Sequence, residues 1–159
     1  MARFGKALLV AAVWMGAAAM VPRARAATAP PDPCSLLTAA EVSKSVGQTL
    51  GAPEKSVAPR PYANTVQGTD CHYSASNGNG ELLFRIYFDA SAAEATDLFA
   101  KLKMFYSPPT PVAGVGDEAY FDPRHGLHAR KGNVRFFLSL GDHTDRQLED
   151  LAILIAGRI

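Results

Sequence analysis

The sequence predicts an α+β fold: an antiparallel sheet of about five strands, with about three helices packed mainly on one face. Three observations lead to this prediction. Capping motifs open three amphipathic helices, alternating apolar and polar residues mark several strands, and short turn signals separate neighbouring strands. Because runs of strands lie between single helices, we expect hairpins and meanders rather than parallel crossover units.

Each expected helix begins with a capping box, in which a hydroxyl and a side chain three residues later satisfy free backbone N–H groups. The boxes are Thr38-x-x-Glu41, Ser91-x-x-Glu94 and Thr144-x-x-Gln147. They predict helices over about 39–46, 92–103 and 145–158, each with its apolar residues on one stripe.

Strict alternation predicts a strand over Leu82–Phe88. The turn signal over residues 77–80 precedes it, so we expect Cys71–Ser74 to pair with this strand as a hairpin. A second meander is expected over Glu118–Phe121, Leu127–Lys131 and Val134–Leu140, and a further short strand around Lys55–Val57.

The dipeptide Gly132-Asn133 sets the register of the last two strands. A two-residue turn there places Arg130 opposite Arg135 and His128 opposite Phe137. The alternate positions then form one apolar face, made of Leu127, Ala129, Phe136 and Leu138. A shift of one residue would mix apolar and polar side chains on both faces, so this register is the one the sequence favours.

The first 26 residues are typical of a cleaved secretory signal peptide. A basic start is followed by an apolar run over Ala7–Val21, and Ala24 and Ala26 are the small residues that a signal peptidase reads. The run is too short to span a bilayer, which needs about 20 residues. We therefore expect a signal peptide over 1–26, a Pro-rich tether over 27–33 and a single domain over 34–159, located in the periplasm or secreted. No transmembrane segment is expected after signal cleavage.

Charge excludes one class of partner. The predicted signal carries four of the basic residues, which leaves twelve basic against fifteen acidic residues in the exported chain. A mildly acidic domain lacks the strongly basic patch that nucleic-acid binding requires. We therefore expect no nucleic-acid partner.

Two cysteines remain after signal cleavage, Cys34 and Cys71. In an oxidising compartment such a pair usually forms a disulfide. A metal-binding pair and a Cys71–His72 nucleophile are the competing interpretations. Further metal ligands at defined spacing would support the first, and a partner base close in space would support the second.

Several short motifs together suggest a family. Asp32-Pro33-Cys34-Ser35-Leu36-Leu37-Thr38, Cys71-His72-Tyr73 and Gly114-Val115-Gly116-Asp117-Glu118-Ala119 occur in this order. With them, the region 32–159 resembles a family of small exported bacterial domains of unknown function, many of which are envelope lipoproteins. The resemblance implies the Cys34–Cys71 pairing and an α+β fold, and it implies no catalytic residue. Because Pro31-Asp32-Pro33 before Cys34 is not a lipidation site, we expect soluble export here.

The sequence predicts no catalytic residue, metal or cofactor. His125-x-x-His128 lacks a third ligand at recognisable spacing. Asp117 and Glu118 are neighbours on an expected strand, so their side chains point to opposite faces instead of converging. No nucleophile elbow, phosphate-binding loop or dinucleotide motif occurs.

The second face of the sheet is the candidate binding site. The register places His128, Arg130, Arg135 and Phe137 together, and Arg85 with Tyr87 joins them if the central strands are neighbours. Directly opposed arginines destabilise a sheet, and an anionic ligand or an acidic partner surface would relieve that repulsion. The alternative interpretation is a solvated outer face with carboxylates from other strands nearby.

These observations favour an exported, non-enzymatic domain that binds a ligand or an envelope protein. One alternative is a small envelope hydrolase using His128 with a carboxylate such as Asp117 or Asp122. The other is a structural subunit of an envelope assembly, in which another chain covers the Leu83–Tyr87 face.

Overall fold

A computed structural model gives the fold. It describes residues 32–63, 65–75, 80–141 and 143–159. The expected signal peptide, residues 27–31 of the expected tether and residues 77–79 of the expected turn lie outside the described residues.

Among the described residues the chain forms four helices and seven strands. The helices are α1 (Pro33–Leu36), α2 (Ala39–Val46), α3 (Ala92–Phe105) and α4 (Asp145–Arg158). The strands are β1 (Glu54–Ala58), β2 (Gly68–Ser74), β3 (Glu81–Phe88), β4 (Thr110–Val112), β5 (Glu118–Phe121), β6 (Leu127–Lys131) and β7 (Val134–Leu140).

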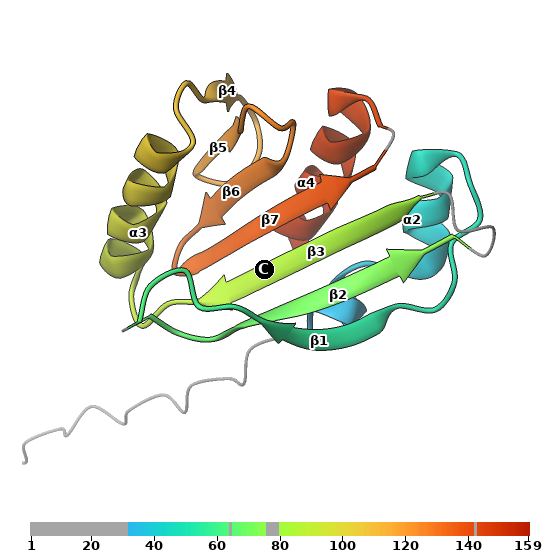
Figure 1. Cartoon of the computed structure of the whole chain (residues 1–159), viewed down its shortest axis with the longest axis horizontal. Helices are drawn as coiled ribbons and strands as arrows, with labels where there is room; N and C mark the ends of the chain where they lie inside the picture. The colour runs from blue at the N-terminus through green and yellow to red at the C-terminus, as the bar shows by residue number, and fades with distance from the viewer. Residues whose placement is uncertain (1–31, 64, 76–79, 142) are drawn as a thin grey trace, which may run out of the picture.

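All seven strands belong to one antiparallel sheet in the order β1-β2-β3-β7-β6-β5-β4. The first three strands form one meander, and the last four form another. The two meanders meet where β3 pairs with β7, from Leu82 opposite Leu140 to Phe88 opposite Val134. Figure 1 shows these two long strands side by side in the middle of the sheet.

The α+β class and the antiparallel pairing are confirmed, but the sheet has seven strands instead of about five and the described chain has four helices instead of about three. The expected strand near residue 55 forms as β1. Both further elements are short: β4 has three residues and contains Pro111, and α1 is a single turn that Asp32 caps. Elements of this length carry almost no periodicity, so the sequence pattern does not reveal them.

The three expected helices form, and the predicted capping residues make the hydrogen bonds at the start of α2. At the start of α2, the Thr38 hydroxyl accepts a hydrogen bond from the Glu41 N–H (3.2 Å), and the Glu41 carboxylate accepts one from the Thr38 N–H (2.9 Å). Gly47 ends this helix in the left-handed conformation, with φ 73°. Helix α3 runs two residues beyond its expected end, to Phe105.

The predicted register of β6 and β7 is also confirmed. Arg130 lies opposite Arg135, and His128 lies opposite Phe137. The apolar positions of both strands are almost completely buried, which makes a one-residue shift costly. These positions are Leu127, Ala129, Phe136 and Leu138.

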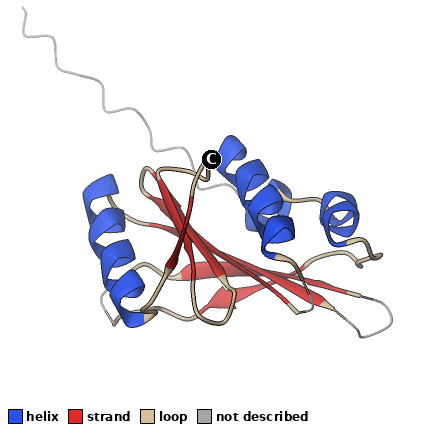
Figure 2. Ribbon diagram, turned by 90° about the horizontal axis from the view of Figure 1, so that it is seen from above, coloured by secondary structure: helices blue, strands red, loops and turns tan. Residues whose placement is uncertain are grey.

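The helices cover both faces of the sheet, although the sequence predicted mainly one. Buried residues of α1, α2 and α4 share one core with the inward side chains of the strands. Helix α3 lies on the opposite face, where Phe99 packs edge-on against Tyr120 with ring centres 5.2 Å apart. Figure 2 shows helices on both sides of the twisted sheet. An apolar stripe predicts that a helix is packed, but it does not say which face of the sheet receives it.

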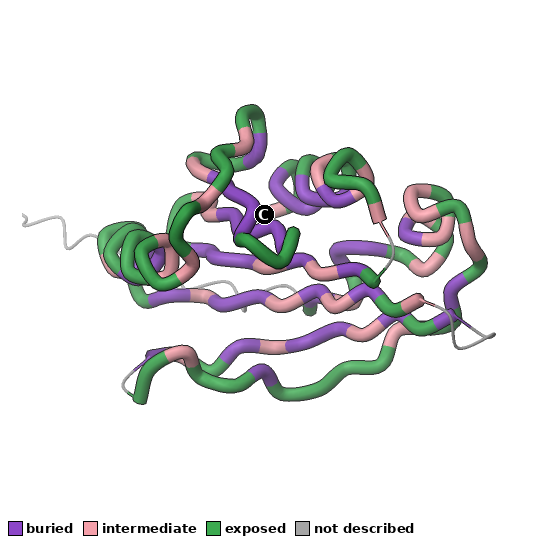
Figure 3. The backbone as a smooth tube through the Cα atoms, turned by 45° about the horizontal axis from the view of Figure 1, so that its top comes forward, coloured by how far each residue is buried: buried purple, intermediate pink, exposed green. Residues whose placement is uncertain are grey.

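Burial falls off from the centre of the sheet to the β1 edge. Figure 3 shows purple positions along the central strands and a mostly green β1, in which only Ala58 is buried. The second face therefore has three parts: a portion under α3, a portion open to solvent, and an edge at β1.

The disulfide between Cys34 and Cys71 is confirmed, and it joins α1 to β2. Next to it, the buried Tyr73 hydroxyl donates a hydrogen bond to the Leu37 carbonyl oxygen over 2.7 Å. Because both sulfur atoms are bonded to each other, neither cysteine serves as a metal ligand or a nucleophile in this structure.

Candidate functional site

A row of three rings crosses the second face of the sheet. Tyr120, His128 and Phe137 lie opposite one another on β5, β6 and β7. The Tyr120 and His128 rings are stacked, with centres 4.8 Å apart and planes 9° apart, and the Phe137 ring centre lies 4.6 Å from that of His128. Tyr106, at the end of α3, adds a third ring around His128 at 5.0 Å.

The imidazole of His128 is held by Asp122. Its Nε2 lies 3.0 Å from the Asp122 Oδ2, and both side chains are buried. Asp122 also accepts hydrogen bonds from the backbone N–H groups of Arg124 (2.8 Å) and Gly126 (3.0 Å). Burial by itself raises the pKa of Asp122, but the hydrogen bonds from His128, Gly126 and Arg124 outweigh it and hold the pKa below its usual value.

This pairing fixes the tautomer of His128. Asp122 is a carboxylate that can only accept, so the Nε2 of His128 carries a proton. In the neutral ring the other nitrogen, Nδ1, is then an acceptor, and it has no hydrogen-bond partner within the described part of the chain. Among the described residues, His128 thus has one ring nitrogen held by Asp122 and a second ring nitrogen without a partner, next to a set of aromatic rings.

The three arginines of the second face each have a carboxylate partner. Arg85 donates from Nε and Nη2 to Asp70, over 2.7 and 2.8 Å, directly across the β2–β3 pair. The other two arginines bind carboxylates outside the strands, Arg135 pairing with Asp89 and Arg130 with Asp117. The repulsion expected between Arg130 and Arg135 is thus relieved within the chain. The premise for an anionic ligand does not hold, and the alternative with carboxylates nearby describes these contacts.

The Asp89–Arg135 pair lies beneath a tyrosine. The Arg135 guanidinium carbon is 4.9 Å from the ring centre of Tyr87, whose hydroxyl donates a hydrogen bond to the Pro59 carbonyl oxygen over 2.9 Å. Gly68 makes room for this ring, because a Cβ atom there would lie 2.6 Å from a Tyr87 ring carbon. The loop that contains Pro59 is therefore attached to the face of the sheet through Tyr87.

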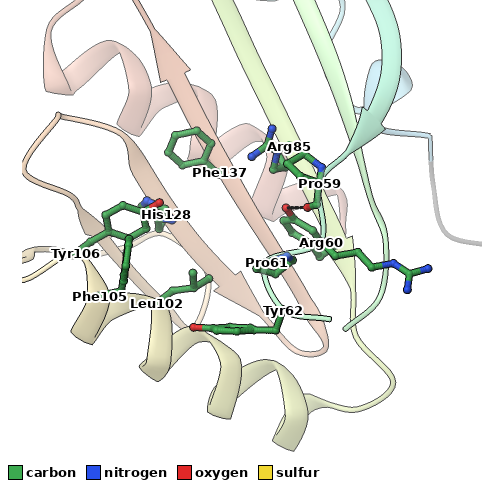
Figure 4. A pocket seen from close by; sticks show the side chains of 11 residues that line it. Pro59, Arg60, Pro61, Tyr62, Arg85, Leu102, Phe105, Tyr106, His128 and Phe137 are labelled. Carbon is green, nitrogen blue, oxygen red and sulfur yellow. Dashed lines mark hydrogen bonds between the residues drawn. The ribbon is translucent and has the colours of Figure 1, made fainter. Parts of the chain in front are cut away.

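A cavity of about 260 Å³ lies between this loop, the end of α3 and the open part of the second face. Figure 4 shows Phe137 and Arg85 on the sheet side, Pro61 and Tyr62 on the loop side, and Leu102 with Phe105 on the helix side. The lining residues are mostly rings and aliphatic groups, and no carboxylate is among them: Pro59, Arg60, Pro61, Tyr62, Arg85, Tyr87, Leu102, Phe105, Tyr106, His128 and Phe137. We refer to this cavity as the ring pocket.

The ring pocket has an unusually exposed apolar rim. Phe105 is 77% exposed on the helix side, and Tyr62 is 41% exposed on the loop side. Its basic side chains are Arg85 and His128, because the Arg60 guanidinium points away from the cavity (Figure 4), and the lining residues Tyr62, Tyr87 and Tyr106 each carry a hydroxyl. A mostly apolar cavity with a small number of polar groups is the usual form of a ligand site.

The structure separates the residues that the sequence grouped together. Arg85, His128 and Phe137 line the ring pocket, whereas Arg130 and Arg135 do not. Arg135 is 2% exposed and lies behind Tyr87, and Arg130 is bound to Asp117. Of the five residues that the sequence proposed for the binding site, three therefore come together in the ring pocket, and two lie outside it.

Sequence reasoning missed both walls of the ring pocket. The loop over residues 59–62 shows no periodicity, and its position depends on the hydrogen bond to Tyr87. The helix wall had a signal: Phe105 and Tyr106 extend an apolar run beyond the stripe of α3. Large apolar residues at the exposed end of a helix mark a possible contact surface.

The other histidines lie outside the ring pocket. His125 and His72 pair with exposed carboxylates, Asp145 at 3.2 Å and Glu81 at 2.7 Å, and His143 contacts backbone carbonyl oxygens. Within the described residues, no group of three or more metal-ligating side chains comes together. Nor does any helix there have the length and apolar character needed to cross a membrane.

No family model matches the chain, and no curated protein matches it. Among solved structures, it is similar to the extracellular domain of PknH from Mycobacterium tuberculosis. That likeness has a TM-score of 0.52 at 14% sequence identity and covers 78% of this chain and 92% of that one. At this identity the similarity concerns the fold alone.

Proposed function

We propose that this chain is an exported, non-enzymatic binding domain whose ligand occupies the ring pocket. One observation carries the proposal: a cavity with an exposed apolar rim is lined by two basic side chains, Arg85 and His128, each held in place by a carboxylate. The disulfide, the similarity in fold to an extracellular domain and the signal peptide expected over 1–26 support export. They agree with a location in the periplasm or outside the cell.

The exposed rim of the ring pocket favours binding over a structural role. Burying a large apolar side chain is favourable by about 1.5–3 kcal/mol of transfer free energy, which an exposed ring does not gain. Phe105 stays exposed at the mouth of the cavity, while Leu98 and Phe99 of the same helix are buried. A ligand that covers Phe105 would recover this free energy, which makes the rim a binding determinant.

A ligand-observed NMR screen of a chemically diverse fragment library tests the proposal on the disulfide-bonded, exported protein. Phe105→Ala should weaken the binding of ring-bearing fragments at least about fivefold, a change of roughly 1 kcal/mol. Met104→Ala is the matched control, because Met104 is the neighbouring residue of α3, is 72% exposed and lies outside the lining. Absence of any fragment whose binding depends on Phe105 would contradict a ligand site here.

A hydrolase is the second candidate, because His128 contacts Asp122, one of the two carboxylates proposed from the sequence. The lining contains no serine, threonine or cysteine among the described residues, so this candidate is a hydrolase in which His128 activates a water molecule. Hydrolysis of p-nitrophenyl acetate tests this candidate. Loss of activity in His128→Gln, but not in His125→Gln, would favour the enzyme. His125 is a suitable control because it also pairs with a carboxylate but is exposed.

A further inference from the structure

We propose that the occupant of the ring pocket is a polypeptide segment that inserts an aromatic side chain and places uncharged peptide groups against Arg85 and His128. This inference rests on the proposed binding function. It differs from the sequence-based expectation of an anionic ligand, and three features of the site lead to it.

The first feature is charge. Arg85 is already neutralised by the bidentate Asp70, and the proton on the Nε2 of His128 faces Asp122. An incoming carboxylate would compete with Asp70 for the guanidinium group. A neutral acceptor needs only the N–H groups that Asp70 leaves unused, since a guanidinium offers five and Asp70 accepts two hydrogen bonds. The site therefore favours an uncharged polar group.

The second feature is a pair of polar side chains that need different partners. Arg85 can only donate, whereas the Nδ1 of His128 accepts in the neutral ring and donates in the protonated ring. A peptide segment carries carbonyl oxygens and N–H groups on successive residues, so it offers partners to Arg85 and to either form of His128. A sugar ring brings more hydroxyl groups than the few polar atoms of this mostly aromatic lining can pair, and unpaired buried hydroxyls are costly.

The third feature is the rim. The cavity of about 260 Å³ has room for one ring and the atoms attached to it. A small molecule of that size would contact Phe105 and Tyr62 only where they face the cavity, and it would leave the outer parts of both rings in water. A chain that crosses the ring pocket would cover both residues, which favours a peptide segment over a free metabolite.

Four amino-acid derivatives test the preference for an uncharged aromatic ligand, with affinities measured by NMR titration or calorimetry. N-acetyl-phenylalanine amide is the neutral probe. N-acetyl-phenylalanine carries a carboxylate, phenylalanine amide carries an ammonium, and N-acetyl-alanine amide lacks the ring. We expect the neutral aromatic probe to bind at least about fivefold more tightly than each of the other three. Equal or tighter binding of the anion by the wild-type protein would overturn the proposal.

Asp70→Asn tests the role of charge directly, because it keeps the shape of the side chain and releases the charge of Arg85. The preference for the neutral probe over N-acetyl-phenylalanine should shrink at least about threefold or reverse. Asp117→Asn is the matched control, since Asp117 also binds an arginine but lies outside the ring pocket. An unchanged preference in a folded Asp70→Asn protein would overturn the neutralisation argument.

A blocked pentapeptide with a central phenylalanine between alanines tests whether the ligand is a peptide segment or a small molecule. It should bind at least about fivefold more tightly than N-acetyl-phenylalanine amide, and Phe105→Ala should remove that gain. Equal affinities would mean that the occupant is a small molecule, against the proposal. If other fragments bind at Phe105 but this series does not, the inference fails while the binding function stands. If nothing binds there, the binding function fails as well.

Discussion

Arg135 stacks its guanidinium group on the ring of Tyr87, 4.9 Å from the ring centre, while Asp89, the residue after β3, binds the same guanidinium. Arg135 is 2% exposed, and Asp89 is equally buried. The hydroxyl of Tyr87 in turn holds Pro59. A buried ion pair therefore supports one wall of the ring pocket, although neither of its residues reaches the cavity.

Removing one member of the buried pair should be strongly destabilising. Asp89→Ala leaves Arg135 buried without a counter-charge, and we expect the free energy of unfolding to fall by about 3–5 kcal/mol. Urea unfolding measures the change. Asp97→Ala, which breaks the exposed pair with Lys101, should cost less than about 1 kcal/mol. Similar costs for the two variants would mean that the Asp89–Arg135 pair does not support the fold.

Tyr87→Phe should loosen the loop that forms one wall of the ring pocket and leave the sheet intact. The ring stays on Arg135, but the hydrogen bond to Pro59 is lost, at a cost of about 1 kcal/mol. Backbone hydrogen exchange at residues 60, 62 and 63 should become faster, while exchange in β3 and β7 stays as in the wild type. Tyr106→Phe is the control, and unchanged exchange in the Tyr87 variant would contradict the attachment.

The disulfide should contribute substantially to stability. Cys34 and Cys71 are separated by 37 residues, and opening a loop of this length lowers the free energy of unfolding by about 4 kcal/mol on the chain-entropy model. We expect the Cys34→Ser/Cys71→Ser variant to show a loss of this order by urea unfolding. Thiol titration of the denatured wild-type protein should detect no thiol until reductant is added, and two reactive thiols in the untreated protein would contradict the bond.

Acid should weaken the contact between α2 and α4. Hydrogen bonds from Arg158 and Thr38 lower the pKa of Glu41 to about 2, from an ordinary value of 4.5. The unfolded chain therefore takes up this proton at a higher pH than the folded chain. The resulting stabilisation is present above pH 4.5 and is lost as the pH falls toward 2. Glu41→Gln should flatten the pH dependence of unfolding in this window, and Glu54→Gln at an exposed position should not.

Local signals predicted much of this fold. The capping boxes gave the start of each of the longer helices, and the turn at Gly132-Asn133 gave the register of β6 and β7. Both are short-range properties, because a cap spans three residues and a tight turn fixes its flanking pairs. The same register correctly placed His128 and Phe137 side by side on the second face.

The candidate site was predicted only in part, because its partners are distant in sequence. Asp89 is 46 residues from Arg135, and Asp70 is 15 residues from Arg85. Neither pairing follows from any local pattern, so the sequence left open whether these arginines have carboxylate partners, and the structure shows that they do. The walls of the ring pocket could not be predicted for the same reason. They form where α3 and the loop over 59–62 meet the sheet, through contacts between residues that are distant in sequence.

The order of the strands has a consequence for how this domain comes apart. Each meander forms from neighbouring segments, whereas the β3–β7 seam joins residues about 50 positions apart and closes the molecule. The Cys34–Cys71 bond joins α1 to β2, on the side of the first meander, so no disulfide crosses the β3–β7 seam within the described chain. Under mechanical or chemical stress the two halves are thus expected to separate along β3 and β7. The ring pocket would be lost in that event, because its floor includes Arg85 from one half and Phe137 from the other.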